Sequence, residues 1–333
     1  MTGPRVKITE VAQAAGVSLS TVSRVMNDNP TVDPVLAERV REVAARLGYT
    51  ANPLARSLVL GRTQTVSVVI PDLANPTFQA ILRGLSHAAA ADGYHVLISD
   101  TEEHAERERD IALTTRRRTD GVILCAPRLP QSELTALLPS VTPAVVINRP
   151  PQDAVPTVTA DYGAAVTELI AHLEAFGHRR IAFLSGAVSS ASGEARRQAI
   201  SRATAADPGL EIIEIPTGVN FDSGAAAADA VLASGVTGVL AFNDLVAMGL
   251  LSAVTGRGIP VPERLSIVGF DDIPFAAYTT PPLTTASVPV AEIGRSAWAA
   301  MHALLTGAEP TMSAHFTPEI VLRASTAAAP VSA

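Results

Sequence analysis

The sequence predicts an α/β protein made of a small all-helical unit followed by a large body of parallel sheets. Capping residues and glycine stops delimit three short helical segments before residue 49. From residue 65 onward, short β-branched runs alternate with Ala- and Leu-rich segments, which is the rhythm of βαβ units. With 333 residues, of which 47% are hydrophobic, the chain can fill the cores of two or three domains.

Composition excludes several classes of protein. No apolar run approaches the roughly 18 residues that a membrane span needs, and the first ten residues lack the pattern of a secretory signal. The single cysteine, Cys125, lies in an apolar run and is expected to be a buried thiol. We therefore expect a cytoplasmic protein with no membrane partner.

The first three helices have clear boundaries in the sequence. Thr9 is predicted to cap the first helix and Gly16 to end it. Ser18 caps the second helix, Asp33-Pro34 starts the third, and Gly48 ends it. The residues expected on the inner faces are Val11, Ala12, Ala15, Val22, Val25, Met26, Leu36, Val40, Val43, Ala44 and Leu47. A tight turn between the first two helices predicts a helix-turn-helix unit.

The outer face of the second helix carries short polar side chains and one arginine. Leu19 and Arg24 can contact a thymine methyl and a guanine edge, while Thr21 and Ser23 suit phosphate oxygens. Residues 1–62 have a net charge of +3, although the whole chain has a net charge of −7. This asymmetry favours a polyanionic partner for residues 1–62 alone. An alternative interpretation of the same pattern is that the second helix is an ordinary solvent-exposed helix of a small bundle and does not bind DNA.

A fourth short helix is predicted over residues 52–60. Asn52 caps it, Pro53 takes the first helical position and Gly61 ends it. A helix this short is marginal in isolation, so it should form only against DNA and a partner subunit. Leu58 could serve as an apolar wedge between base steps in the minor groove.

Seven strands are predicted in the body, and the polar residues that follow them are candidates for a ligand site. The strands span residues 66–70, 94–98, 121–125, 144–147, 180–184, 238–242 and 265–270. A Pro-rich segment at 149–156 places the boundary between two sheets near Asp161. In parallel sheets, ligands bind beyond the carboxyl ends of the strands. Hydroxyls, amides, carboxylates and an arginine at these ends suit a neutral polyol, although each Asn or Asp could instead be only a helix N-cap.

These segments together resemble the LacI/GalR family of transcriptional repressors. The resemblance rests on Ala15-Gly16-Val17-Ser18, Thr21-Val22-Ser23-Arg24-Val25, Asn52-Pro53 with Ala55-Arg56 and Leu58, and Val268-Gly-Phe-Asp-Asp272. It implies that a homodimer binds a pseudo-palindromic DNA operator and that Leu58 intercalates at its centre. The residues expected on DNA are Ser18, Leu19, Ser20, Thr21, Ser23, Arg24, Asn27, Tyr49, Asn52, Ala55, Arg56 and Leu58.

The same resemblance implies a core similar to periplasmic sugar-binding proteins, with a small effector, expected to be a sugar, in a cleft between two subdomains. The effector-binding residues it implies are Asn75, Phe78, Asn148, Arg149, Arg196, Asn243, Asp244 and Asp271. The expected division is 1–48 for the helix-turn-helix domain, 49–62 for the hinge helix and linker, 63–160 with 288–316 for the first subdomain, and 161–287 with 317–330 for the second.

Three departures from the family pattern leave the effector's identity open. They are Ala199-Ile200 after Arg196, Thr77 in the first pocket loop, and Asn148 before Arg149. Whether the effector induces or co-represses is also undecided. No cofactor, metal spacing or catalytic pair is found in the sequence, so an enzyme is not expected. A solute-binding protein of a transport system would lack a DNA-reading helix.

Overall fold

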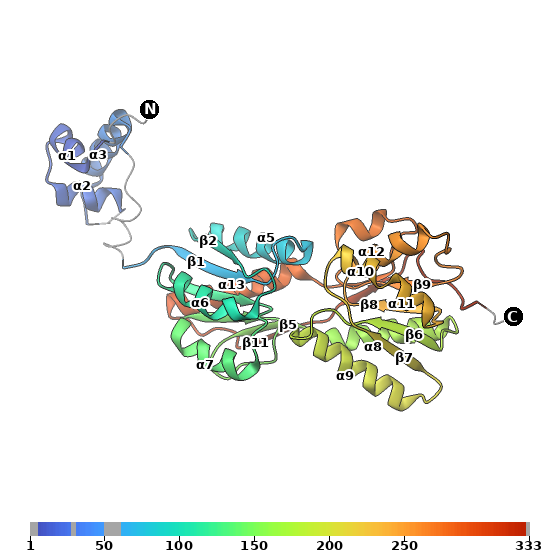
Figure 1. Cartoon of the computed structure of the whole chain (residues 1–333). Helices are drawn as coiled ribbons and strands as arrows, with labels where there is room; N and C mark the ends of the chain where they lie inside the picture. Colours follow the sequence, from blue (N-terminus) through green and yellow to red (C-terminus); the bar gives the residue numbers. More distant parts are fainter. Residues whose placement is uncertain (1–5, 28–30, 50–60, 331–333) are drawn as a thin grey trace. The chain divides into compact units, whose positions relative to one another are not determined.

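The computed structural model describes residues 6–27, 31–49 and 61–330 (Figure 1). The chain divides into two compact units, residues 1–64 and 65–333. Among the described residues, no helix combines the length and the apolar character needed to cross a membrane.

The first unit contains the three predicted helices, α1 (Ile8–Ala15), α2 (Leu19–Met26) and α3 (Pro34–Leu47). The Ser18 hydroxyl accepts a hydrogen bond from the Thr21 N–H at 3.1 Å, and the Asp33 carboxylate caps α3. Gly16 and Gly48 end their helices in the left-handed conformation. The prediction of a helix-turn-helix unit is therefore confirmed.

Two details of this unit differ from expectation. Lys7, and not Thr9, is the N-cap of α1, because Glu10 accepts a hydrogen bond from the Lys7 N–H at 3.1 Å and satisfies a donor at the helix start. Three of the expected inner residues, Met26, Leu36 and Leu47, are only half-buried, since they lie at the margin of a small core. The buried centre of that core is formed by Val11, Ala12, Ala15, Val22, Val25, Ala37, Val40, Val43 and Ala44.

The second unit begins with a lobe, here called the first lobe, built on a six-stranded sheet in the order β11-β5-β4-β3-β1-β2. All its pairings are parallel. Its strands are β1 (Thr65–Ile70), β2 (His95–Asp100), β3 (Gly121–Cys125), β4 (Ala144–Ile147), β5 (Thr157–Ala160) and β11 (Ser313–Phe316). Helices α5 (Pro76–Ala91) and α13 (Val290–Thr306) pack together on one face, and α6 (Ala105–Arg116) and α7 (Gln131–Val141) cover the other.

The other lobe, called the second lobe, contains a parallel sheet in the order β7-β6-β8-β9. Its strands are β6 (Arg180–Leu184), β7 (Glu211–Ile215), β8 (Gly238–Ala241) and β9 (Ser266–Val268). Helices α8 (Tyr162–Ala175) and α9 (Ala191–Ala206) cover one face, and α10 (Phe221–Ala226), α11 (Ala228–Ala233) and α12 (Asp244–Thr255) cover the other. A short 3-10 helix, η1 (Pro274–Tyr278), follows β9. Strands β10 (Thr285–Ser287) and β12 (Glu319–Val321) form a separate antiparallel pair.

The seven predicted strands are all present, and three of them, β3, β4 and β6, have the predicted bounds. The sequence analysis missed β5, β7, β10, β11 and β12. These strands are short, with three to five residues each, and β7 and β11 are edge strands whose side chains are half-buried or exposed. These two edge strands therefore lack the continuous apolar run that identifies a central parallel strand.

Glycines allow pairs of helices in both lobes to pack closely. A Cβ atom on Gly294 of α13 would collide with the Ile81 carbonyl oxygen of α5, and one on Gly84 of α5 would collide with the Ala291 carbonyl oxygen of α13. In the same way, a Cβ atom on Gly224 of α10 would collide with the Val246 carbonyl oxygen of α12, and one on Gly249 of α12 would collide with the Phe221 carbonyl oxygen of α10. The spacing of these helices therefore depends on the absence of a side chain.

We predict that Gly294→Ala lowers the free energy of unfolding by about 1–3 kcal/mol, because α5 and α13 must move apart. Gly163→Ala is the matched control: its Cβ would meet its nearest neighbours at 3.5 Å, in ordinary contact, and alanine favours the helix by up to about 1 kcal/mol. Urea denaturation followed by circular dichroism measures both. Equal stability of the two variants would contradict the role given to Gly294.

Candidate functional site

The outer face of α2 is exposed, as the sequence predicts. Leu19 is 48% exposed although it is a large apolar residue, and Ser20 and Arg24 are exposed beside it. Thr21 and Ser23 are half-buried at the edge of this face. Short side chains let a helix backbone approach base edges closely, and an exposed arginine supplies a forked donor.

Three other residues expected on DNA have contacts within the unit itself. The Ser18 hydroxyl lies 2.8 Å from the hydroxyls of both Ser20 and Thr21. The Asn27 amide donates to the Ser23 carbonyl oxygen at 2.8 Å at the end of α2, and Tyr49 packs against the helical core. The remaining four expected residues, Asn52, Ala55, Arg56 and Leu58, lie outside the described residues.

A cavity lies between the two lobes, at the carboxyl ends of both sheets. Every strand from β1 to β9 is followed by a segment that lines it. The cavity encloses about 450 Å³ between atoms, part of it open to solvent. Its lining residues are Asn75, Thr77, Phe78, Glu103, Ala126, Arg128, Asn148, Tyr162, Ser190, Ser192, Arg196, Val219, Phe242, Asn243 and Asp271.

Arg196 of α9 is the central cation of this cavity. Its side chain is almost fully buried, and its guanidinium carbon lies 4.1 Å from the ring centre of Phe270, 4.5 Å from that of Phe242 and 4.7 Å from that of Tyr162. Nε and Nη1 have no hydrogen-bond partner among the described residues. Burial lowers the pKa of Arg196 to about 10, and the Asp271 carboxylate opposes this shift. Aromatic rings thus stabilise the charge while in-plane N–H groups remain available to a ligand.

Asp271 links the two lobes. Its carboxylate accepts a hydrogen bond at 2.8 Å from the Thr77 hydroxyl, which belongs to the first lobe. Its backbone has φ = +104°, a strained conformation for a residue other than glycine. Burial raises the pKa of Asp271 to about 6, against the opposing effects of Arg196 and Thr77. Strain and desolvation at one residue are typical of a functional position.

Three asparagines line the cavity, and two of them also cap helices. The Asn75 side chain accepts from the Thr77 N–H at 2.9 Å, and that of Asn243 accepts from the Val246 N–H at 2.9 Å. The side-chain oxygens of these two residues therefore act as helix N-caps, as the alternative interpretation of the sequence predicts. Asn148 differs, because its side-chain oxygen is buried and has no hydrogen-bond partner among the described residues. A ligand donor would satisfy it.

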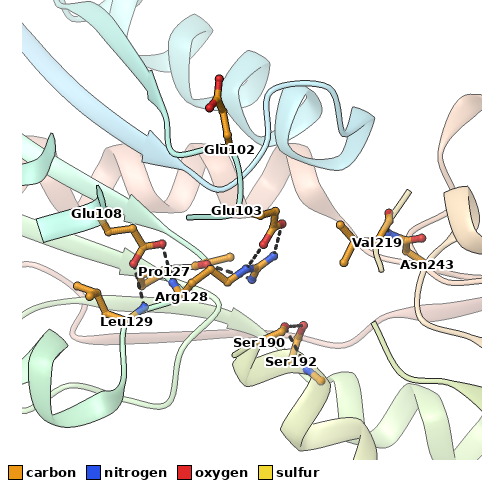
Figure 2. Close-up of polar contacts among 12 residues, drawn as sticks. Glu102, Glu103, Glu108, Pro127, Arg128, Leu129, Ser190, Ser192, Val219 and Asn243 are labelled. Atoms are coloured by element: carbon orange, nitrogen blue, oxygen red, sulfur yellow. Dashed lines mark hydrogen bonds and ion pairs between the residues drawn. The ribbon is translucent and has the colours of Figure 1, made fainter. Parts of the chain in front are cut away.

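A pair of opposite charges forms another part of the wall (Figure 2). Arg128 donates to both carboxylate oxygens of Glu103, at 2.6 and 2.7 Å. The buried Glu108 carboxylate accepts from the backbone N–H groups of Arg128 and Leu129 at 2.6 and 2.9 Å. Burial raises the pKa of Glu108, against these hydrogen bonds. Glu108 thus holds the main chain of the loop after β3, while Glu103 neutralises the charge of Arg128 in that loop.

Of the eight residues expected to bind an effector, six line the cavity and two do not. Arg149 donates to the carbonyl oxygens of Pro127 and Leu129 at 3.0 and 2.9 Å, outside the cavity. Asp244 accepts from the Ile273 N–H at 2.8 Å and from the Thr285 hydroxyl at 2.6 Å, and is fully buried. Burial raises the pKa of Asp244 well above its ordinary value. These contacts hold loops of the lobes in place.

The site also contains residues that the sequence analysis did not select. Tyr162 and Phe242 surround Arg196, and Arg128 and Glu103 form the charged pair. Arg128 lies three residues beyond a correctly predicted strand, so the rule of polar residues after strands could have found it. Tyr162 follows β5, a strand that was missed, and therefore carried no such signal.

A helix-turn-helix unit joined to a two-lobed core with a polar cavity between its lobes defines the class of ligand-responsive DNA-binding regulators. The family of bacterial regulatory proteins called the lacI family matches residues 7–52, and the periplasmic binding protein-like domain matches residues 170–326. The repressor CytR of Escherichia coli (strain K12) is 32% identical over 332 residues, covering 96% of each chain. The regulator GalS of Salmonella typhimurium is 33% identical over 333 residues, covering 97% of each.

Solved structures agree with these relatives. The Lac repressor dimer bound to operator and the anti-inducer ONPF superposes with a TM-score of 0.89 at 26% identity, covering 98% of this chain and 100% of the other. The complex of the transcriptional regulator CelR with cellobiose has a TM-score of 0.69 at 28% identity and covers 96% and 100%. The chain belongs to the LacI family. It is a DNA-binding transcriptional regulator and not an enzyme.

We predict that Arg24→Ala removes discrimination at one base pair of the operator, at a cost of about 1–3 kcal/mol, because a forked contact to a base edge is lost. Binding to random duplex DNA should change little. Fluorescence anisotropy with operator variants measures this, with Arg39→Ala, an exposed arginine of α3, as the control. A uniform loss on all sequences would assign Arg24 to phosphate instead.

The raised pKa of Asp271 makes stability depend on pH. The folded value of about 6 exceeds the value of about 3.9 expected in the unfolded chain, so the native state retains a proton that the unfolded state has lost. The stability contributed by neutral Asp271 is lost as pH rises through this window. We therefore expect Asp271→Asn to gain stability relative to the wild type as pH rises from 4.5 to 7.

Urea denaturation of both proteins at the two pH values checks this expectation. Other titrating groups are common to both proteins, so their contributions largely cancel. A stability difference that stays constant with pH would show that Asp271 does not titrate in this range.

Proposed function

We propose that this protein represses transcription from a pseudo-palindromic operator, which it binds as a cytoplasmic homodimer, and that a small sugar in the cavity between the lobes changes its affinity for DNA. The observation that carries the proposal is Arg196, which lines the cavity and whose buried Nε and Nη1 donors have no hydrogen-bond partner among the described residues. A buried, unsatisfied guanidinium is costly, and a ligand with oxygen acceptors would remove that cost.

The electrostatics of the cavity support an uncharged ligand. Arg128 is paired with Glu103 through two hydrogen bonds, and Arg196 shares the cavity with Asp271. The charges are therefore nearly balanced at neutral pH. Hydroxyls of Ser190 and Ser192, amides of Asn75 and Asn148, and the ring of Phe78 complete the lining. Alternating donors and acceptors beside aromatic rings suit a polyol such as a sugar, and the CelR structure is a complex with cellobiose.

The DNA-binding residues are proposed on the pattern of α2 and the sequence that follows it. Leu19, Ser20 and Arg24 would read the major groove, with Ser18, Thr21, Ser23, Asn27 and Tyr49 near phosphates. Asn52, Ala55, Arg56 and Leu58 would form the hinge helix that enters the minor groove. We propose that residues 1–48 form the helix-turn-helix domain and residues 49–62 the hinge helix and linker. Residues 63–160 with 288–316 form the first core subdomain, and residues 161–287 with 317–330 form the second.

Exposed apolar side chains on both lobes support a homodimer. On the first lobe, Leu97 and Ile98 of the edge strand β2 are 39% and 42% exposed. On the second lobe, Phe221, Phe275 and Tyr278 are 45%, 55% and 86% exposed. Apolar surface of this kind marks protein interfaces, and the Lac repressor structure is a dimer on its operator.

A ligand screen on the full-length protein tests the proposal. An operator is first selected from random duplexes, and the melting temperature and operator affinity are then measured with glucose, galactose, ribose and xylose, with nucleosides as a second class. A sugar at a hundredfold excess over its Kd should stabilise the protein by about 2.7 kcal/mol and change operator affinity at least fivefold. Arg196→Met should lose both responses and still bind operator.

Two outcomes would contradict the proposal. Absence of sequence preference among duplexes at moderate salt would refute operator binding. Stabilisation by nucleosides but by none of the sugars would refute the sugar class while leaving the cavity as the effector site.

A further inference from the structure

A run of three arginines, Arg116, Arg117 and Arg118, lies at the end of α6 and has no role in the proposed function. The Arg116 guanidinium donates to the carbonyl oxygens of Thr142 and Thr119 at 2.8 and 2.7 Å. Arg117 and Arg118 are exposed, and their side chains form no hydrogen bond or ion pair with any described residue. We call these two residues the arginine pair. Both of its guanidinium groups are available to an anion from outside the chain.

The arginine pair is unusual because the second unit is acidic. Residues 1–62 have a net charge of +3 although the whole chain has a net charge of −7, so the negative charge lies in the rest of the chain. Several other exposed arginines of the second unit form ion pairs with carboxylates, as Arg107 does with Glu102 at 2.8 Å and Arg179 does with Asp207 at 2.6 Å. A polyanion such as DNA is repelled by an acidic body and attracted by an unpaired basic group on it.

The arginine pair lies near the point where the chain enters the first lobe from the helix-turn-helix unit. Thr65 begins the second unit and is also the first residue of β1. The Asp120 N–H, two residues beyond Arg118, donates to the Thr65 carbonyl oxygen at 2.7 Å, and α6 packs against β1. A partner bound by the segment immediately before Thr65 is therefore close to the arginine pair.

The proposed hinge helix is such a segment. Residues 52–60 are proposed to enter the minor groove, and only residues 61–64 separate them from Thr65. A fully extended chain spans at most about 3.6 Å per residue, so Thr65 lies within roughly 18 Å of residue 60. The arginine pair next to Thr65 is then within reach of the phosphates that border the same minor groove.

We propose that Arg117 and Arg118 bind phosphates beside the hinge helix, so that the first lobe forms part of the DNA-binding surface of this regulator. Guanidinium groups bind phosphate oxygens through their charge and their forked N–H donors. Phosphate contacts position a protein on DNA and do not read bases, so the arginine pair adds affinity without adding sequence preference. This inference rests on the proposed function, since it requires a hinge helix on an operator.

The salt dependence of operator binding tests this inference on the full-length protein. The affinity is measured by fluorescence anisotropy from roughly 50 to roughly 300 mM KCl, and each phosphate contact contributes about 0.9 to the slope of log K against log salt. For Arg117→Gln/Arg118→Gln we expect the slope to fall by about 2–4, because both subunits lose contacts, with at least tenfold weaker binding at roughly 100 mM. An operator with one altered half-site base pair should lose affinity by the same factor.

Two double variants control for charge and for folding. Arg109→Gln/Arg264→Gln removes two other exposed arginines whose side chains form no hydrogen bond or ion pair with a described residue, and Arg109 lies about 12 Å from Arg117 along α6. This variant has the same net charge as the test variant and should keep the wild-type slope. Arg117→Lys/Arg118→Lys keeps both charges and should also keep the slope. Urea denaturation of all variants shows whether folding changes, since cations at the end of a helix also complement its dipole.

The outcomes separate this inference from the proposed function. If Arg117→Gln/Arg118→Gln keeps the wild-type slope and still prefers the operator, the phosphate contacts are refuted and the proposed function stands, even where urea shows a lower stability. An equal loss of slope in Arg109→Gln/Arg264→Gln, or a loss of slope in the lysine variant, also refutes a local charge contact by the arginine pair. If the wild-type protein prefers no duplex sequence, the proposed function and this inference fail together.

Discussion

The burial of one guanidinium among three aromatic rings organises the whole cleft. Arg196 lies within 4.7 Å of the ring centres of Tyr162, Phe242 and Phe270, which come from segments after three different strands. Cation–π attraction stabilises the charge, but the in-plane Nε and Nη1 donors have no acceptor among the residues that the structure describes. Because unsatisfied buried donors destabilise a structure, the site is preorganised for a ligand that supplies oxygen atoms.

A side-chain hydrogen bond between Thr77 and Asp271 connects the two lobes beside this site. Thr77 of the first lobe donates to Asp271 of the second, and Asp271 combines a strained backbone conformation with a half-buried side chain that interacts with Arg196. A ligand that competed for this carboxylate, or that contacted both lobes, would change the relative stability of different arrangements of the two lobes. Such a difference in affinity between two states is what coupling to DNA binding requires, and the coupling is reciprocal.

Structural and functional roles overlap at several positions of the cavity. Asn75 and Asn243 cap helices with their side-chain oxygens and still face the ligand space. Glu108 holds the main chain of the loop that presents Arg128, while Glu103 holds its side chain. Rigid support of this kind reduces the entropy lost when a ligand is bound. Asp244, which is fully buried outside the lining, has a pKa raised well above its ordinary value because burial penalises its charged form.

The sequence by itself determined the local features. Caps and glycine stops defined the three helices of the first unit, and continuous apolar runs defined the central strands, because both signals arise from neighbouring residues. The family resemblance also placed six of the eight expected effector residues around the cavity. Only the tertiary structure decided which polar side chains after the strands face the ligand space. Arg149 and Asp244 each follow a strand only one residue later than Asn148 and Asn243 do, yet they bind carbonyl, N–H and hydroxyl groups of other loops. The three aromatic rings around Arg196 belong to Tyr162, Phe242 and Phe270, which are 80 and 28 positions apart along the chain. No pattern of neighbouring residues predicts that these rings lie together.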